Sequence, residues 1–319
     1  MFARNRSREL LLRPMTHEDI ETVRDVGQVA WSDLAMHDIG RKFRYPKRSE
    51  KIIDAYIAKD PEGCIVAERD GKIIGSAFSH TWGKVGWIGP LEVLPSHQGS
   101  GVGKALLRGC EMYLERSGCQ VIGLETMAHL PKQLHFYMSS GYTPKNLTMI
   151  MEKVLRREAE PEGVEEARSQ DMDSIVKGIA KLSARVNPLL DYSLEAKVIV
   201  EKRLGNVFLS REGDQLVGAA LLHTYQRGEE APYSSIKAVV VDPQVPNGED
   251  IFHRLMERCE QTSLTMGKNR LLARFSTDHP VLYPTMIQRD FSLKGANVRM
   301  VRNGQYRESG SYHISSWAG

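Results

Sequence analysis

The chain has few cysteines, no long apolar run and little net charge. Its four cysteines, Cys64, Cys110, Cys119 and Cys259, show no CxxC or other metal-ligand spacing. This pattern favours reduced thiols in a cytoplasmic protein over a disulfide framework. No apolar stretch approaches the roughly 18 residues of a membrane span. The net charge of +3, from 43 basic and 40 acidic residues, is too small to indicate nucleic acid as the main partner.

The remaining composition is that of a soluble globular protein, with 41% hydrophobic and 26% charged residues. A length of 319 residues predicts two domains of roughly 150 residues each. A strand pattern at 9–13 leads into a helical pattern, and two apolar runs at 64–80 flank Asp70-Gly71, which predicts a hairpin. The second half repeats this order, with a hairpin at 206–224 around Glu212-Gly213.

An internal repeat supports this division of the chain. EVLP (92–95) aligns with VVDP (240–243) at an offset of 148 residues, and VIGLETM (121–127) aligns with RLLARFS (270–276) at 149. Two blocks that keep almost one offset indicate a tandem duplication of whole domains. We therefore expect one domain at 1–155, a linker at 156–163, where charge, proline and glycine interrupt the pattern, and a second domain at 164–319.

A glycine-rich turn gives the first functional signal. Gly99, Gly101 and Gly103 separate a strand pattern that ends near Pro95 from a helical pattern that begins at Val102. Free backbone N–H groups at a helix N-terminus bind anions, and glycines let the backbone approach a phosphate closely. The segment has neither the P-loop nor the dinucleotide-binding spacing. It indicates a phosphate-binding turn or, in the simpler interpretation, a turn without a ligand.

The segment QGSGVG (98–103) resembles the [QR]-x-x-G-x-[GA] signature of the GNAT superfamily of N-acetyltransferases. GLETMAHLPKQLHFYMSSGY (123–142) is similar to the fifth strand, fourth helix and FYxxxGF ending of the same fold. The resemblance is good over 9–152 and weak over 164–302. It implies an α/β (α+β) fold of two tandem GNAT-like domains, each with a mixed, mostly antiparallel sheet flanked by helices.

The resemblance implies an acyltransferase that uses acetyl-CoA as co-substrate, without a metal. The acceptor would be a primary amine of a small molecule or peptide that attacks directly in a ternary complex. The implied cofactor-binding residues lie on the strand that would pair with pantetheine and on the pyrophosphate loop: Leu91, Val93, Gln98, Gly99, Ser100, Gly101, Val102, Gly103 and Lys104. Leu130 departs from the family pattern, which often has an asparagine there.

The implied reaction needs a base, because an alkylamine is protonated at neutral pH. Glu125 lies twelve residues before Tyr137, a spacing similar to that in ribosomal-protein N-terminal acetyltransferases, and is the expected base. Glu92 is the competing base. By resemblance, Tyr137 supplies a proton to the departing thiolate. The simpler interpretations are solvated glutamates and a core aromatic residue.

The acceptor region is less informative. The segment 37–51 carries several basic residues around Phe43 and Tyr45. It favours a solvated basic loop and leaves open an anionic acceptor such as an acidic peptide or a phosphorylated metabolite.

The second domain is expected to be degenerate and non-catalytic. At the repeat offsets, Glu249 and Ile251 replace two of the loop glycines, and Arg274 and Met286 replace the two proposed proton carriers. Carboxylates at that helix start would repel a pyrophosphate. An enzyme acting in the first domain is therefore the leading hypothesis. The alternative is a non-enzymatic acyl-CoA-binding sensor or scaffold. Neither needs a nucleic acid or a membrane.

Overall fold

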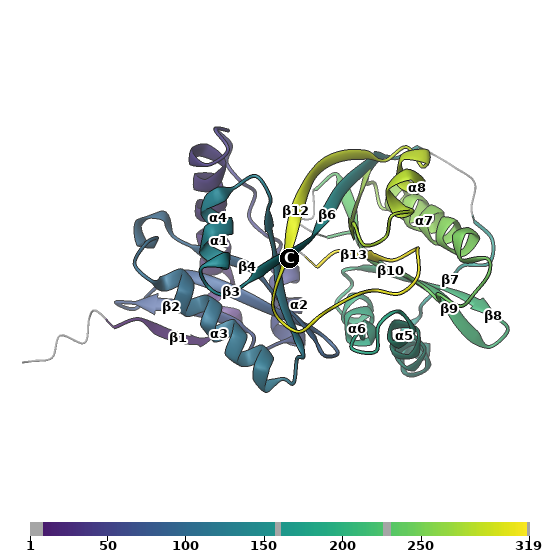
Figure 1. Cartoon of the computed structure of the whole chain (residues 1–319), viewed down its shortest axis with the longest axis horizontal. Coiled ribbons are helices and arrows are strands. Elements are labelled where there is room, and N and C mark those ends of the chain that lie inside the picture. Colours follow the sequence, from purple (N-terminus) through teal and green to yellow (C-terminus); the bar gives the residue numbers. More distant parts are fainter. Residues whose placement is uncertain (1–8, 157–160, 226–230, 318–319) are drawn as a thin grey trace, which may run out of the picture.

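The computed structural model describes residues 9–156, 161–225 and 231–317, and the same succession of elements occurs twice in it (Figure 1). The first half contains β1 (Leu11–Pro14), α1 (Ile20–His37), α2 (Glu50–Lys59), β2 (Cys64–Arg69), β3 (Lys72–Trp82), β4 (Val85–Val93), α3 (Val102–Arg116), β5 (Val121–Met127), α4 (Pro131–Met138) and β6 (Thr143–Val154). The second half contains β7 (Glu165–Glu166), α5 (Met172–Val186), α6 (Ser193–Glu201), β8 (Gly205–Glu212), β9 (Gln215–His223), β10 (Tyr233–Val241), α7 (Gly248–Thr265), β11 (Arg270–Ser276), α8 (Leu282–Gln288) and β12 (Ser292–Asn303), and a short β13 (Ile314–Ser315) follows. The predicted tandem α/β fold is confirmed.

Local sequence signals place the first-half elements that matter for function. Asp70 and Gly71 both have positive φ, 53° and 72°, which is the turn geometry that two-residue hairpins prefer. They join β2 to β3, which pair antiparallel. Helix α3 begins at Val102, as its apolar spacing predicts, and buries Leu106, Cys110 and other residues of that face against the sheet.

The last strand of each half is exchanged with the other half. β6 pairs antiparallel with β11 of the second half, and β12 pairs antiparallel with β5 of the first half. β6 and β12 also pair with each other (Figure 1), so one continuous sheet runs in the order β1-β2-β3-β4-β5-β12-β6-β11-β10-β9-β8-β7. The two predicted mixed sheets are therefore joined into one, a feature that the sequence pattern does not reveal.

Apolar packing also joins the halves. Trp82 and Trp87 of the first half share a buried cluster with helices α5 and α6 and strands β8 to β10 of the second half. Trp317, near the C-terminus, stacks on Trp82 at a ring-centroid distance of 5.5 Å and meets Trp87 edge-on at 4.7 Å. Residues 313–317 thus lie in the core between the two halves.

The predicted domain boundary stays a prediction. Residues 157–160 of the linker expected at 156–163 lie outside the described residues. β6 precedes this linker yet pairs with a strand of the second half, so a cut at 155 would not separate two complete sheets.

All four cysteines are free. Among the described residues, no helix combines the length and apolar character needed to cross a membrane.

Candidate functional site

A wedge opens between β4 and β5 where their parallel pairing stops. The two strands pair from Val85 with Val121 to Ile88 with Leu124 and then separate. A register shift in β4 accompanies the separation, and His80 Nε2 lies 2.7 Å from the Gly89 carbonyl oxygen at this point. On its other side β4 stays paired with β3. In the described chain, the β4 edge at Leu91–Val93 that faces the wedge therefore has no strand partner.

A cavity of about 620 Å³ occupies the wedge and collects most of the predicted site residues. The predicted residues that line it are Leu91, Glu92, Val93, Gln98, Gly99, Gly101, Gly103, Lys104, Glu125 and Tyr137. Ser100 and Val102 do not line it. The Ser100 hydroxyl donates to the His97 carbonyl oxygen at 2.7 Å, and the Val102 side chain is buried in the core. Only the backbone of these two residues is therefore available to a ligand.

The glycine-rich turn has the geometry of an anion site. Gly99 and Gly101 have φ of +74° and +88°, which L side chains rarely adopt, and a Cβ at either would meet nothing within 4 Å. Gly101 caps α3, and the first turn of that helix carries no acidic residue. Its unpaired N–H groups and the positive end of the helix dipole therefore face the cavity without a competing carboxylate. Lys104 is exposed beside them.

Glu125 is a buried carboxylate with one free oxygen. Its side chain is fully buried, and its Oε1 accepts hydrogen bonds from Arg299 Nε at 2.9 Å and from Thr148 Oγ1 at 2.9 Å. Oε2 has no hydrogen-bond partner among the described residues. Glu125 follows the last β5 residue that pairs with β4, and it lies opposite Arg299 on β12. Arg299 and Thr148 thus hold the carboxylate through Oε1 alone.

Glu92 is also buried, but both of its oxygens are occupied. Oε1 accepts from Trp31 Nε1 at 2.7 Å and from Arg48 Nη2 at 3.0 Å. Oε2 accepts from Ser76 Oγ at 3.3 Å and from Arg48 Nη1 at 3.4 Å. Glu92 therefore links β4 to α1, to β3 and to the segment before α2, and these contacts hold the four parts of the chain together.

Tyr137 lies on α4 at the cavity wall, with its ring 4.9 Å from that of Phe136. Its hydroxyl makes no hydrogen bond to the described part of the chain. Burial, with a smaller contribution from the Cys110 thiol, raises the pKa of Tyr137 to about 12. The hydroxyl therefore keeps its proton at neutral pH and is able to donate it.

The second half completes the cavity through residues that the sequence analysis missed. Arg274 of β11 and Asn297 of β12 line it together with Ile150 of β6, and Arg299 holds Glu125 from behind. The repeat register aligns Arg274 with Glu125 but gives no sign that the two strands serve one site. Strand exchange is the physical reason for their proximity.

The basic segment before α2 is less solvated than expected. Arg48 is buried in an ion pair with Glu92, and Lys47 pairs with Asp25 at 2.6 Å. The expectation of a solvated loop is therefore wrong for Arg48. Tyr45, from the same segment, stacks on Trp31 at 5.5 Å, and both rings line the cavity.

The corresponding place in the second half is filled by the chain itself. β10 and β11 pair in parallel over three residue pairs and then separate. Beyond that point β13 pairs with β10, Ser315 with Ala238 and Ile314 with Val239, which correspond to Pro90 and Leu91 at the repeat offset of 148. The first turn of α7 carries Glu249 and Asp250. In the first half, by contrast, the described chain leaves the β4 edge at Leu91–Val93 without a strand partner, and the first turn of α3 carries no acidic residue.

Comparison with known proteins gives a consistent result. Residues 29–142 match the acetyltransferase (GNAT) family. An uncharacterized N-acetyltransferase of Methanocaldococcus jannaschii is 28% identical over 140 residues, which cover 43% of this chain and 81% of that protein. A candidate acetyltransferase from Pyrococcus horikoshii has a similar structure, with a TM-score of 0.67 and 15% identity over 100% of this chain and 97% of that one. A tandem GNAT protein from the clavulanic acid biosynthesis pathway gives a TM-score of 0.56 and 14% identity over 94% and 100% of the two chains.

Proposed function

Because residues 29–142 belong to the GNAT acetyltransferase family, we propose that the chain is an acetyl-CoA-dependent N-acetyltransferase whose reaction takes place in the first half. The observation that carries this proposal is that Glu125, whose buried Oε2 has no hydrogen-bond partner among the described residues, lines the same cavity as the glycine-rich turn and Tyr137. A proton acceptor, a proton donor and an anion site in one cavity are the groups that acyl transfer to an amine requires.

The cofactor would be held by backbone groups. The N–H groups at the start of α3, reached through Gly99 and Gly101, suit a pyrophosphate, and Lys104 adds a positive charge. The unpaired edge of β4 at Leu91–Val93 suits the amide groups of pantetheine, which would pair with it as an added strand. Acetyl-CoA bound in this way would supply the acetyl group as a reactive thioester.

Two side chains would handle the protons. Glu125 Oε2 would accept a proton from the acceptor ammonium group, directly or through a water molecule, which leaves the amine nucleophilic. Arg299 and Thr148 fix the other oxygen and so orient the carboxylate. Tyr137, which is protonated at neutral pH, would donate its hydroxyl proton to the departing sulfur. We prefer Glu125 to Glu92 as the base because both oxygens of Glu92 accept hydrogen bonds from Arg48, Trp31 and Ser76.

The acceptor would be a protonated primary amine of a small molecule or peptide. Asp33 and Asp38 line the cavity in addition to the two glutamates, and the stacked rings of Trp31 and Tyr45 offer an apolar and cation-attracting surface. Two basic residues that would have favoured an anionic acceptor, Lys47 and Arg48, are already paired with carboxylates. An amine on an apolar body fits this lining best.

The second half would bind no cofactor and would shape the acceptor end of the cavity. β13 occupies the edge of β10 at which pantetheine would pair, and Glu249 and Asp250 stand where a pyrophosphate would lie. Carboxylates in the first turn satisfy the helix dipole and repel a phosphate. From the second half, Arg274 and Asn297 line the cavity of the first half.

Release of the CoA thiol tests the proposal. Full-length protein is incubated with acetyl-CoA and a panel of primary amines that includes polyamines, aromatic amines and peptide N-termini, and free thiol is measured. We expect release that depends on one amine class and that falls at least about 100-fold in E125Q. The exposed Glu201 on α6 supplies a control, E201Q, which should behave as wild type. Acetyl-CoA binding without release for any amine would contradict an enzyme and support the sensor alternative.

A further inference from the structure

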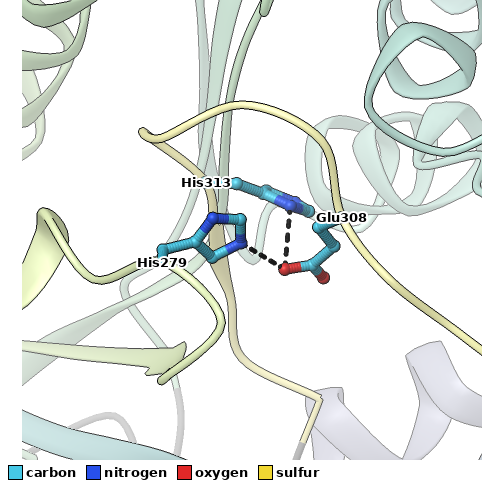
Figure 2. A group of neighbouring side chains, drawn as sticks. All are labelled: His279, Glu308 and His313. Atoms are coloured by element: carbon cyan, nitrogen blue, oxygen red, sulfur yellow. Dashed lines mark hydrogen bonds and ion pairs between the residues drawn. The ribbon is translucent and has the colours of Figure 1, made fainter.

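Two histidines and a glutamate that do not line the cavity meet in the second half. His279 lies in the turn between β11 and α8, whereas Glu308 and His313 lie in the segment between β12 and β13 (Figure 2). The three side chains are 1% exposed, and one ligand atom from each lies within 4.8 Å of the others. Three potential metal ligands from two separate segments of the chain are thus buried next to one another.

The hydrogen bonds of His279 leave its second nitrogen facing an acceptor. Nδ1 lies 3.1 Å from the Gly310 carbonyl oxygen, which only accepts, so Nδ1 carries the hydrogen. Nε2 lies 2.6 Å from Glu308 Oε2. A neutral imidazole would place a lone pair against a carboxylate oxygen at that distance. Either a proton or a metal cation must therefore lie between them.

His313 distinguishes these two possibilities. Its Nδ1 lies 3.2 Å from the same Glu308 oxygen, yet neither of its ring nitrogens makes a hydrogen bond within the described residues. Glu308 Oε1 makes none either, and Arg299 Nη1 lies 3.8 Å from it. One extra proton on His279 would satisfy its contact with Glu308, and a hydrogen on His313 Nδ1 would point at the same oxygen at 3.2 Å, but His313 Nε2 and Glu308 Oε1 would still lack partners among the described residues. Each buried polar group left without a partner costs about 1–3 kcal/mol, whereas a cation among the three side chains would use both imidazoles and the carboxylate.

We propose that His279, Glu308 and His313 bind one divalent transition-metal ion, with Zn²⁺ the best match. Two imidazole nitrogens and one carboxylate oxygen are zinc ligands, and around an ion with bonds of about 2 Å they would lie about 3.3 Å apart. The distance from His313 Nδ1 to Glu308 Oε2 is already 3.2 Å, whereas the 2.6 Å from His279 Nε2 to that oxygen would lengthen. The Gly310 carbonyl orients His279, as the outer contacts of metal-bound histidines do. No metal was expected from the sequence, and the positions of these three residues, 279, 308 and 313, fit no common zinc motif.

The ion would have a structural role. The three side chains fill three of the four positions of a tetrahedral ion, and because they are closed to solvent the fourth position would not face a substrate. The ion would tie the segment that contains Glu308 and His313 to the turn after β11, and this segment leads directly into β13. It would therefore hold β13 against β10 and, through the contacts of Ser315 with Arg299, support the strand that orients Glu125.

Metal analysis of the full chain, purified without a histidine tag, tests the site. After chelation and dialysis, Zn²⁺ is titrated while bound metal and melting temperature are measured. We expect one Zn²⁺ per chain, a higher melting temperature with metal, and a Co²⁺-substituted protein with visible absorption. E308Q and H313A should each bind Zn²⁺ at least about 100-fold more weakly.

A surface pair serves as the matched control. His17 Nδ1 lies 3.2 Å from Asp54 Oδ1, but the His17 side chain is 65% exposed, so H17A should bind Zn²⁺ like the wild type. Limited proteolysis gives a readout that needs no variant, since cleavage within 304–317 should accelerate when Zn²⁺ is removed. No bound Zn²⁺ and an unchanged melting temperature would overturn the proposal in favour of a protonated His279. Zn²⁺ binding that survives both E308Q and H313A would also overturn it.

Discussion

Replacing Arg299 with methionine tests the contact through which the second half reaches Glu125. Arg299 Nε donates to Glu125 at 2.9 Å, and Nη2 donates to the backbone and side-chain oxygens of Ser315 at 2.7 and 2.8 Å. The Arg299 and Glu125 side chains are 5% and 0% exposed, so removal of Arg299 would leave a buried carboxylate without its charged partner. Removal of one partner from a buried ion pair costs about 3–5 kcal/mol. We expect R299M to lower the free energy of unfolding by this amount.

A double-mutant cycle separates the ion pair from other effects of the substitution. E125Q removes the charge that Arg299 neutralises, so R299M should cost about 1.5–3 kcal/mol less in the E125Q background than in the wild type. Urea unfolding followed by tryptophan fluorescence measures all four proteins, and Trp317 is a nearby reporter because its ring lies 4.4 Å from Arg299 Cζ. Costs that add to within about 0.5 kcal/mol would refute the coupling.

A second buried pair between the halves controls for general destabilisation. Lys153 of β6 pairs with Glu260 of α7 at 2.6 Å, with both side chains less than 10% exposed. K153M should destabilise the protein comparably, yet its kcat should stay unchanged at a temperature where it is folded. R299K, which keeps a charge but loses the fork that reaches both Glu125 and Ser315, should lower kcat. Equal losses of kcat in K153M and R299K would show that Arg299 has no particular positioning role.

The remaining substitutions assign the proton transfers. E125Q should lower kcat about 10²–10⁴-fold, whereas E92Q should mainly lower the free energy of unfolding because it disturbs the contacts with Arg48 and Trp31. Steady-state kinetics and urea unfolding measure the two effects. The reverse pattern would make Glu92 the base. Y137F should lower kcat more than it raises KM for acetyl-CoA, and an unchanged kcat would exclude Tyr137 as the proton donor. The raised pKa of Tyr137, about 12, keeps its hydroxyl protonated well above neutral pH. A pH–rate profile of the wild type should therefore show no loss of kcat from Tyr137 ionisation between about pH 8 and 10.

Local signals predicted the parts of the site that depend on neighbouring residues. The Asp70-Gly71 hairpin and the start of α3 at Val102 lie where the sequence places them, because turn chemistry and helical periodicity act over a few residues. The position of the glycine-rich turn at the wedge follows from the same signals and from the family motif. These residues carry the cofactor part of the proposal.

The acceptor side could not be predicted in this way, because it depends on strand exchange. The alternation of apolar and polar residues in β6 and β12 indicates strands, but it does not specify which strand each one pairs with. Arg299 and Glu308 look like surface charges in GANVRMVRNGQYRES (295–309), yet both are buried. Their partners are distant in the chain, so only the folded structure brings Arg299 to Glu125 and Glu308 to its histidines.

One acetyl-CoA per full-length chain is the expected stoichiometry, because only the first half offers an open β4 edge and a glycine-rich turn free of carboxylates. Calorimetry must use the whole chain, since a fragment that begins at residue 160 lacks β6, which pairs with β11. G101E places a carboxylate and a strained backbone in the turn and should reduce the stoichiometry from one to zero. Gly213, also at positive φ with open space around a Cβ, gives the control G213E, which should keep one site. Two sites in the wild type, or one remaining in G101E, would mean that the second half binds the cofactor despite β13 and Glu249.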